Sequence, residues 1–217
     1  MTVIQDPDAS PPSRAGSLPL VGGALAFDFA NTQSGLGYES HQNHLRNAQN
    51  VAAWIEHAGS LSKEEVALLR AGMAAEPKVA AELLDRAIAL RAAIHAVGSA
   101  IAAGAAPPED ALAALAKLHL RCLKRAKLAV AKDAAGWRWS VAAAPVEAAL
   151  GPIALSAVAV FTEGDFSRVK QCGGHACGWL FYDTTKNNGR RWCEMEVCGN
   201  RAKQKRLAAR RRGGVET

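Results

Sequence analysis

Four cysteines near the end of the chain constrain its fold more than any other feature. Cys172, Cys177, Cys193 and Cys198 follow the spacing C-x4-C-x15-C-x4-C. A tetrahedral zinc ion needs four such ligands, and two cysteine pairs on two tight turns supply them once the intervening segment folds back. Glycines flank three of the four sulfurs, which lets backbone amides approach a metal–thiolate cluster closely. We therefore predict one structural zinc ion (Zn²⁺) held by these four thiols.

Other uses of these cysteines stay open at this point. His175 lies inside the first loop and is able to replace one thiolate. Two disulfides are a further alternative, but the first residues carry no basic segment followed by an apolar stretch, as a secretory signal peptide would. We therefore expect a cytoplasmic protein, and in that reducing compartment the spacing favours metal over disulfide. Cys122 falls in a helical segment and is interpreted as a small buried apolar residue.

The charge of the chain is concentrated at its C-terminal end. Residues 168–217 contain 12 Lys and Arg against 4 Asp and Glu, so this part carries +8 while residues 1–167 carry −2. Such an imbalance favours an element that meets a polyanion. A solvated, disordered basic tail is the plainer alternative, although the charges begin directly after the predicted metal site.

The basic tail is predicted to be helical from Asn200 to Arg212. It is rich in strong helix formers, and Gly213-Gly214 is a stop signal. Cationic side chains near its end also suit the helix dipole, which is a purely structural explanation for Arg210 to Arg212. We expect its basic side chains to contact phosphates or base edges of nucleic acid: Arg201, Lys203, Lys205, Arg206 and Arg210.

The segment between the cysteine pairs predicts a strand, a turn and a return. Residues 180–182 have strand propensity, and Asn188-Gly189 is a strong hairpin signal. The basic residues Lys186, Arg190 and Arg191 on this turn are placed to contact a phosphate backbone. Three aromatic residues, Trp179, Phe181 and Trp192, are interpreted as a miniature core beside the metal rather than as base-stacking groups.

These residues carry a resemblance to a known family. The stretch CGWLFYD…RRWCEMEVCGNRAK resembles the CGNR zinc finger, whose name appears here as the sequence 198–201. The match includes the pair Phe181-x-Asp183 and the run 191–193. It implies that the four cysteines hold zinc and that the module binds DNA in bacterial transcription regulators. Glu194 departs from the small polar residue that is usual there, which leaves the zinc assignment unchanged.

The front of the chain resembles the ABATE domain, which accompanies this finger in stress-induced transcription regulators. LAFDFANT (25–32) resembles its opening motif, and NVAAWIEHAG (50–59) resembles the short tryptophan-containing helix that follows. The resemblance implies an N-terminal domain that senses a ligand or forms a homodimer. On this basis the chain divides into a flexible segment 1–19, an ABATE-like domain 20–165 and a zinc module 168–212.

The residues themselves predict a mainly α fold with a small β element. We expect a helix capped by Asn50 and running to His57, and another that starts with a capping box at Ser62–Glu65. Further helices are expected at 79–101, 109–128 and 145–161, with a strand at 137–144. No apolar run approaches the roughly 18 residues that a membrane span needs. The C-terminal module adds its β-hairpin and basic helix.

A ligand pocket in the N-terminal domain is a weaker hypothesis. Asp28, Asn31, His41 and His44 lie in or near a polar loop and could line it. The plainer interpretation is that Asp28 and Asn31 are local caps and the histidines are exposed. No nucleophile elbow, Walker loop or HExxH appears, so we expect no enzyme and assign no catalytic residue. The best interpretation is a transcription regulator that binds duplex DNA, and the alternative is an RNA-binding or protein-docking zinc module.

Overall fold

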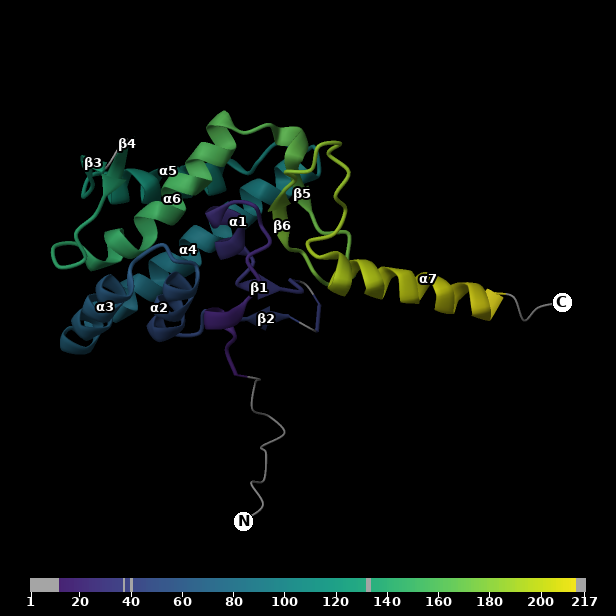
Figure 1. Ribbon diagram of the computed structural model, residues 1–217, viewed down its shortest axis with the longest axis horizontal. Coiled ribbons are helices and arrows are strands. Elements are labelled where there is room, and N and C mark those ends of the chain that lie inside the picture. The colour runs from purple at the N-terminus through teal and green to yellow at the C-terminus, as the bar shows by residue number, and fades with distance from the viewer. Residues whose placement is uncertain (1–11, 37, 40, 132–133, 214–217) are drawn as a thin grey trace, which may run out of the picture.

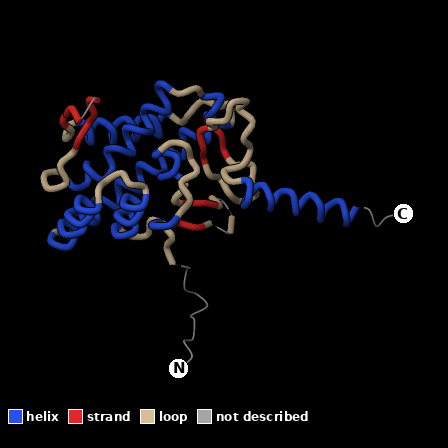
Figure 2. Tube along the Cα trace, in the orientation of Figure 1, coloured by secondary structure: helices blue, strands red, loops and turns tan. Residues whose placement is uncertain are grey.

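A helical body with one projecting helix makes up the protein. The computed structural model describes residues 12–36, 38–39, 41–131 and 134–213. Figure 1 shows α7 (Asn200–Gly213) pointing away from the packed helices, with its far end near the C-terminus. Helices dominate the trace, and strands form three small pairs within the described residues (Figure 2). The expected fold class, mainly α with a C-terminal cysteine module, is confirmed.

Two long helices organise the body. α4 (Pro77–Ala102) and α6 (Pro145–Glu163) contact each other, and both contact α1 and α5. The interior is filled by large side chains that are fully buried, among them Phe27, Phe29 and Trp54. Phe29 and Trp54 meet edge to face with ring centroids 4.9 Å apart. The remaining body helices are α1 (Leu25–Ala30), α2 (Ala48–His57), α3 (Lys63–Ala75) and α5 (Glu109–Leu123).

α6 is the one described helix that is long and apolar enough to cross a membrane. Its buried residues instead belong to the core: Val146, Leu150 and Ile153 are all at most 3% exposed. A helix at the centre of a soluble core has the same composition as a membrane span because both are surrounded by apolar groups. The burial of α6 therefore accounts for its apolar sequence.

Helix starts follow the local sequence closely. The capping box predicted at Ser62–Glu65 is present, with the Ser62 hydroxyl accepting from the Glu65 N–H and the Glu65 carboxylate accepting from the Ser62 N–H. α2 begins earlier than expected, because Asn47 rather than Asn50 is its cap. The Asn47 side chain accepts the Asn50 N–H at 2.9 Å, so Asn50 is already inside the first turn.

The predicted elements around residue 130 need correction. The helix expected at 109–128 ends at Leu123, and the chain turns into β3 (Lys127–Ala131), which pairs antiparallel with β4 (Ala134–Arg138). The strand expected at 137–144 is therefore displaced towards the N-terminus, and residues 141–143 form a turn before α6. Residues 127–131 form a strand because β4 folds back and pairs with them. The local sequence does not show this pairing.

The hairpin expected inside the zinc module is also different. β6 (Leu180–Tyr182) pairs with β5 (Val169–Gln171), which precedes it, and residues 184–192 form no return strand. Asn188 does adopt a left-handed conformation, with φ of 47°, as a turn residue. Asp183 explains the difference, because its carboxylate accepts the N–H groups of Thr185 and Arg190 that a return strand would have offered.

The segment before α1 is ordered where the structure describes it. Residues 1–19 were expected to be flexible, but Ala15 and Leu18 are buried, and the short 3-10 helix Ala15–Ser17 contacts α2. The Ser13 hydroxyl also donates to the carbonyl oxygen of His44 at 2.7 Å. The expectation is therefore wrong for residues 12–19, while residues 1–11 lie outside the described part.

Candidate metal centre and basic surface

The four cysteine sulfurs converge on one point. All four Sγ atoms lie within 4.8 Å of one another, and Cys193 Sγ is 3.7 Å from that of Cys177 and 3.6 Å from that of Cys198. Four thiolates about 2.3 Å from a zinc ion stand roughly 3.8 Å apart in a tetrahedron. A disulfide would need about 2.0 Å. The thiols therefore fit one zinc ion and do not fit two disulfides.

The backbone around the sulfurs is shaped for them. The N–H groups of Gly174 and Cys193 point at Cys172 Sγ from 3.4 and 3.3 Å. A side chain at position 174 would crowd the cluster, because a Cβ there would lie 3.0 Å from Cys198 Sγ. Amide donors stabilise a thiolate ligand by spreading its negative charge. The glycines beside the cysteines thus have the role that the sequence indicated.

The thiols alone cannot all ionise in this space. Hydrogen bonds from the thiols of Cys177 and Cys193 lower the pKa of Cys172 to about 2, and the same contact raises the pKa of Cys177 to about 12. The pKa of Cys193 is raised by both neighbours, and burial raises that of Cys198. A bound divalent cation would ease this conflict, because its two positive charges offset part of the negative charge of the four thiolates. A closed set of four ligands leaves no open position, so the zinc role is structural.

His175 does not replace a thiolate. It is exposed, and its ring lies 5.3 Å from the ring of Tyr38, outside the sulfur cluster. Cys122 is likewise separate. It is buried in the helical core, where burial raises its pKa to about 12. Both observations leave Cys172, Cys177, Cys193 and Cys198 as the ligand set.

The aromatic residues of the module form the expected miniature core. Phe181 is fully buried against the cysteines, and Trp179 and Trp192 pack partly buried beside it. The Trp179 indole N–H also donates to the carbonyl oxygen of Gln33, in the N-terminal domain, at 2.9 Å. These contacts give the small module a hydrophobic centre in addition to its metal site.

Asp183 organises the loop between the cysteine pairs. It is fully buried, and Lys170 Nζ lies 2.6 Å from its carboxylate. Burial acts to raise the pKa of Asp183, but hydrogen bonds from Lys170, Thr185 and the Arg190 N–H outweigh it and lower the pKa. The sequence indicated Asp183 only through the family motif. The local sequence could not predict the role of Asp183, because its partner Lys170 lies outside the loop that Asp183 stabilises.

Arg190 has a different place from the one expected. Its guanidinium donates to the carbonyl oxygens of Val21, Trp192 and Cys193 and lies 4.3 Å above the Phe181 ring. These bonds point it into the protein and tie the cysteine loop to the N-terminal segment. We therefore remove Arg190 from the set of residues proposed to meet phosphate, while Lys186 and Arg191 are exposed on the same loop.

α7 is an isolated basic helix. The short helical turn η3 (Met195–Gly199) contains Cys198 and leads directly into α7. It is also the element that α7 contacts most. Apart from half-buried Ala202 and Ala208, its side chains from Asn200 to Arg211 are exposed. One exposed helix therefore carries all the basic residues that the sequence indicated in this segment: Arg201, Lys203, Lys205, Arg206 and Arg210.

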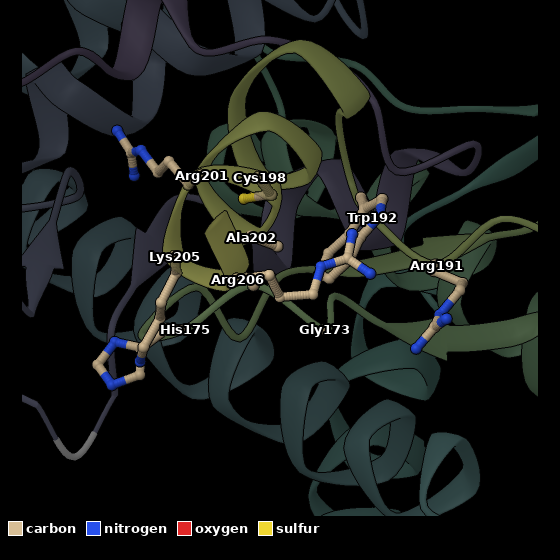
Figure 3. Close-up of a pocket in the computed structure, with 10 residues that line it drawn as sticks. Gly173, His175, Arg191, Trp192, Cys198, Arg201, Ala202, Lys205 and Arg206 are labelled. Carbon is tan, nitrogen blue, oxygen red and sulfur yellow. The ribbon is translucent and has the colours of Figure 1, made fainter. Parts of the chain in front are cut away.

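A basic cavity lies where α7 leaves the zinc site. It measures about 620 Å³ and lies between the glycine loop 173–175, residues 191–192 and the first turns of α7. Figure 3 shows the side chains of Arg206 and Trp192 next to each other and that of Lys205 beside His175. The described lining includes no acidic residue. An anionic group is the natural occupant of such a surface.

The four residues suggested for a ligand pocket have separate surroundings in the structure. The Asp28 carboxylate accepts the Gly22 N–H at 2.7 Å, and burial raises its pKa to about 6. Asn31 pairs through its amide with the backbone of Leu180, at 2.8 and 2.9 Å. His44 is buried and accepts the Arg14 N–H, whereas His41 is exposed. Each residue thus has a separate local role.

The zinc module is tightly joined to the helical domain, which the sequence did not reveal. His95 on α4 bonds to the Gly178 carbonyl oxygen at 3.1 Å, and the Gly35 N–H donates to that of Cys177 at 3.0 Å. Gly98 makes room for β6, since a Cβ there would lie 2.6 Å from Leu180 Cδ1. A glycine inside a predicted helix was the only available signal of this contact. The domain limits 20–165 and 168–212 remain predictions.

Two family models match the chain. The model ABATE, described as "Putative stress-induced transcription regulator", matches residues 23–164. The model described as "CGNR zinc finger" matches residues 168–211. The two matches occur in the order that the sequence motifs indicated. No curated protein matches the chain.

Proposed function

This chain belongs to the ABATE family and carries a CGNR zinc finger, and on that premise we propose that it regulates transcription by binding duplex DNA through its zinc module. The observation that carries the proposal is the free basic helix α7, which starts two residues after the ligand Cys198. A helix with few packing partners and seven cations is costly unless a polyanion neutralises it.

Cys198, as a zinc ligand, would fix where this helix begins. Cys198 belongs to the turn that precedes α7, and the Asn200 side-chain amide donates to the Glu196 carbonyl oxygen at 2.9 Å. The ion, when bound, would tie this turn to the loop of Cys172 and Cys177. The helix would then leave the module in one direction, which presents its basic side chains as a rigid unit rather than as a mobile tail.

The dimensions and charges of α7 suit the major groove of DNA. A helix with side chains is about 10–12 Å wide, and the groove is about 12 Å wide. We propose that Arg201, Lys205 and Arg206 approach phosphates or base edges. Lys203 and Arg210 lie on the same helix and are proposed to do the same. Lys186 and Arg191 on the neighbouring loop would contact the backbone of the same duplex.

The N-terminal domain is proposed to supply the regulatory input, through a small-molecule ligand or through formation of a homodimer. We propose that the protein acts in the cytoplasm, where a regulator of transcription meets DNA in a bacterium. We propose no catalytic activity, and no residue is assigned to one.

RNA binding or docking to an acidic protein is the second candidate. The observation in its favour is the Trp192 side chain in the cavity beside α7, because an aromatic face can stack on an unpaired base. Stacking of this kind needs a single strand, which a closed duplex does not offer. The two candidates therefore differ in the nucleic acid that binds.

A competition experiment separates them. Fluorescein-labelled duplex DNA is bound to the zinc-loaded full chain and displaced with unlabelled duplex or with a structured RNA containing a loop. The proposal predicts that duplex displaces the probe at lower concentration than the RNA does. Displacement by RNA at much lower concentration favours the alternative, and no binding of either favours an acidic protein partner.

A further inference from the structure

One buried arginine in the N-terminal domain has no counter-charge. Arg91, on α4, is only 4% exposed. No ion pair joins it to any residue in the part of the chain that the structure describes. Burying an unpaired guanidinium costs several kcal/mol, so proteins rarely retain one without a use. Arg86 and Lys170, which are half-buried, are paired with Glu147 and Asp183, and half-buried Arg190 instead donates to three backbone carbonyl oxygens.

The groups that do contact Arg91 are neutral and few. Its Nη1 donates to Asn43 Oδ1 at 2.8 Å and reaches Thr32 Oγ1 at 3.4 Å. A guanidinium has five N–H donors, and these two contacts use one nitrogen. Burial alone lowers the pKa of Arg91 to about 10, with no acidic group opposing it. The guanidinium thus keeps both charge and donor capacity for another partner.

The surroundings of Arg91 are electropositive. Burial is the main cause that lowers the pKa of His44, and three arginines add to it: Arg14, Arg46 and Arg91. Burial and the charge of Arg91 also act to lower the pKa of His95, one helical turn along α4. Both imidazoles therefore stay neutral near pH 7, and neither offers Arg91 a counter-charge. A site of this kind attracts a negative ligand.

We propose that Arg91 is the anchor of a small-anion site in the N-terminal domain and that its ligand is a carboxylate. The planar guanidinium matches a carboxylate with two parallel N–H···O bonds. Its two hydrogen bonds here both use Nη1, and the Thr32 hydroxyl only accepts from it because the Thr32 proton is donated to the Phe29 carbonyl oxygen. The anion supplies the missing counter-charge. This inference names a site apart from the proposed DNA surface and does not depend on it.

The site adjoins the contacts that hold the zinc module. Thr32 lies between Asn31, which pairs with Leu180, and Gln33, whose carbonyl oxygen accepts from Trp179. β1 (Gln33–Ser34) pairs with β2 (Gln42–Asn43), so Asn43 joins Arg91 to the same strand pair. An anion bound at Arg91 would brace this strand pair, and with it the loop that holds Cys177.

Thermal unfolding of the zinc-loaded full chain tests the site. Sodium formate, sodium acetate and sodium phosphate are titrated at constant ionic strength, with chloride as the reference anion. The measured chains are the wild type, Arg91→Met, and Arg125→Met, which removes an exposed arginine after α5 as the matched control. We expect formate or acetate to raise the Tm of the wild type and of the control saturably, by about 5–10 °C at 100 times Kd.

The Arg91→Met chain separates a ligand residue from a structural one. We expect it to be at least as stable in chloride as the wild type, because an unpaired buried charge is removed, and to show no carboxylate response. A chain less stable than the wild type in chloride, or an unchanged response, overturns the site. A larger response to phosphate than to acetate overturns the carboxylate assignment. The rate of zinc transfer from the wild-type chain to a chromogenic chelator tests the bracing. We expect bound carboxylate to slow this transfer, and an unchanged rate overturns the bracing.

Discussion

Replacing Asn31 by alanine should loosen the zinc module from the helical body. The Asn31 side chain is 2% exposed and pairs with both the N–H and the carbonyl oxygen of Leu180, at 2.8 and 2.9 Å. Alanine leaves two buried backbone groups without partners, each at a cost of about 1–3 kcal/mol. The free energy of unfolding should therefore fall by roughly 2–6 kcal/mol.

For a chain of this size that loss corresponds to a Tm decrease of about 10 °C. Circular dichroism of the zinc-loaded protein measures it, with Asn187→Ala, an exposed loop asparagine, as the control. The zinc content should stay at one ion per chain, because no ligand is changed. If Asn31→Ala lowers Tm no more than the control does, the pairing contributes nothing and the two modules are not joined as described.

Three further predictions follow from the metal site, the buried carboxyl group and the basic helix. Cys198→Ser should abolish stoichiometric zinc after dialysis against a chelator, as measured by elemental analysis, whereas Cys122→Ser should keep one ion per chain because Cys122 lies outside the sulfur cluster. Because the pKa of Asp28 is raised to about 6, the folded chain holds a proton that the unfolded chain releases, so stability falls as pH rises from about 4 to 6. Asp28→Asn keeps an acceptor for the Gly22 N–H and should raise stability above pH 6 by about 1–2 kcal/mol, a figure reduced for solvent screening; a Tm–pH curve parallel to that of the wild type would count against this. Arg206→Gln should weaken duplex DNA binding and reduce the slope of log K against log salt by about 0.9, while Lys117→Gln on α5 should leave the slope unchanged; equal slopes in all three chains would exclude a phosphate contact at Arg206.

Local sequence predicted the features that depend on local chemistry. The cysteine spacing identified the metal site because four ligands on two turns need little help from the rest of the fold. The capping box at Ser62 and the helix in residues 200–213 followed from short patterns for the same reason. Each of these depends on groups within a few positions of one another.

Features that depend on distant partners were missed or misplaced. Asn31 and Leu180 are 149 positions apart, so nothing near either residue signals their pairing. β6 took β5 as its partner because Asp183 closes the following loop with Lys170. Arg190 resembled a surface cation in the sequence, yet its acceptors at Val21 and Cys193 lie far apart in the chain. Long-range hydrogen bonds, rather than propensity, decided these places.

We propose above that a zinc-anchored basic helix binds duplex DNA, and fluorescence anisotropy over a salt series measures this binding. The full chain is titrated against random duplex DNA before and after zinc is removed by a chelator. We predict tight binding that weakens steeply with salt and is lost when the metal is removed. Binding that survives zinc removal with the same affinity and salt slope would contradict it, because the tail would then act as a simple polycation.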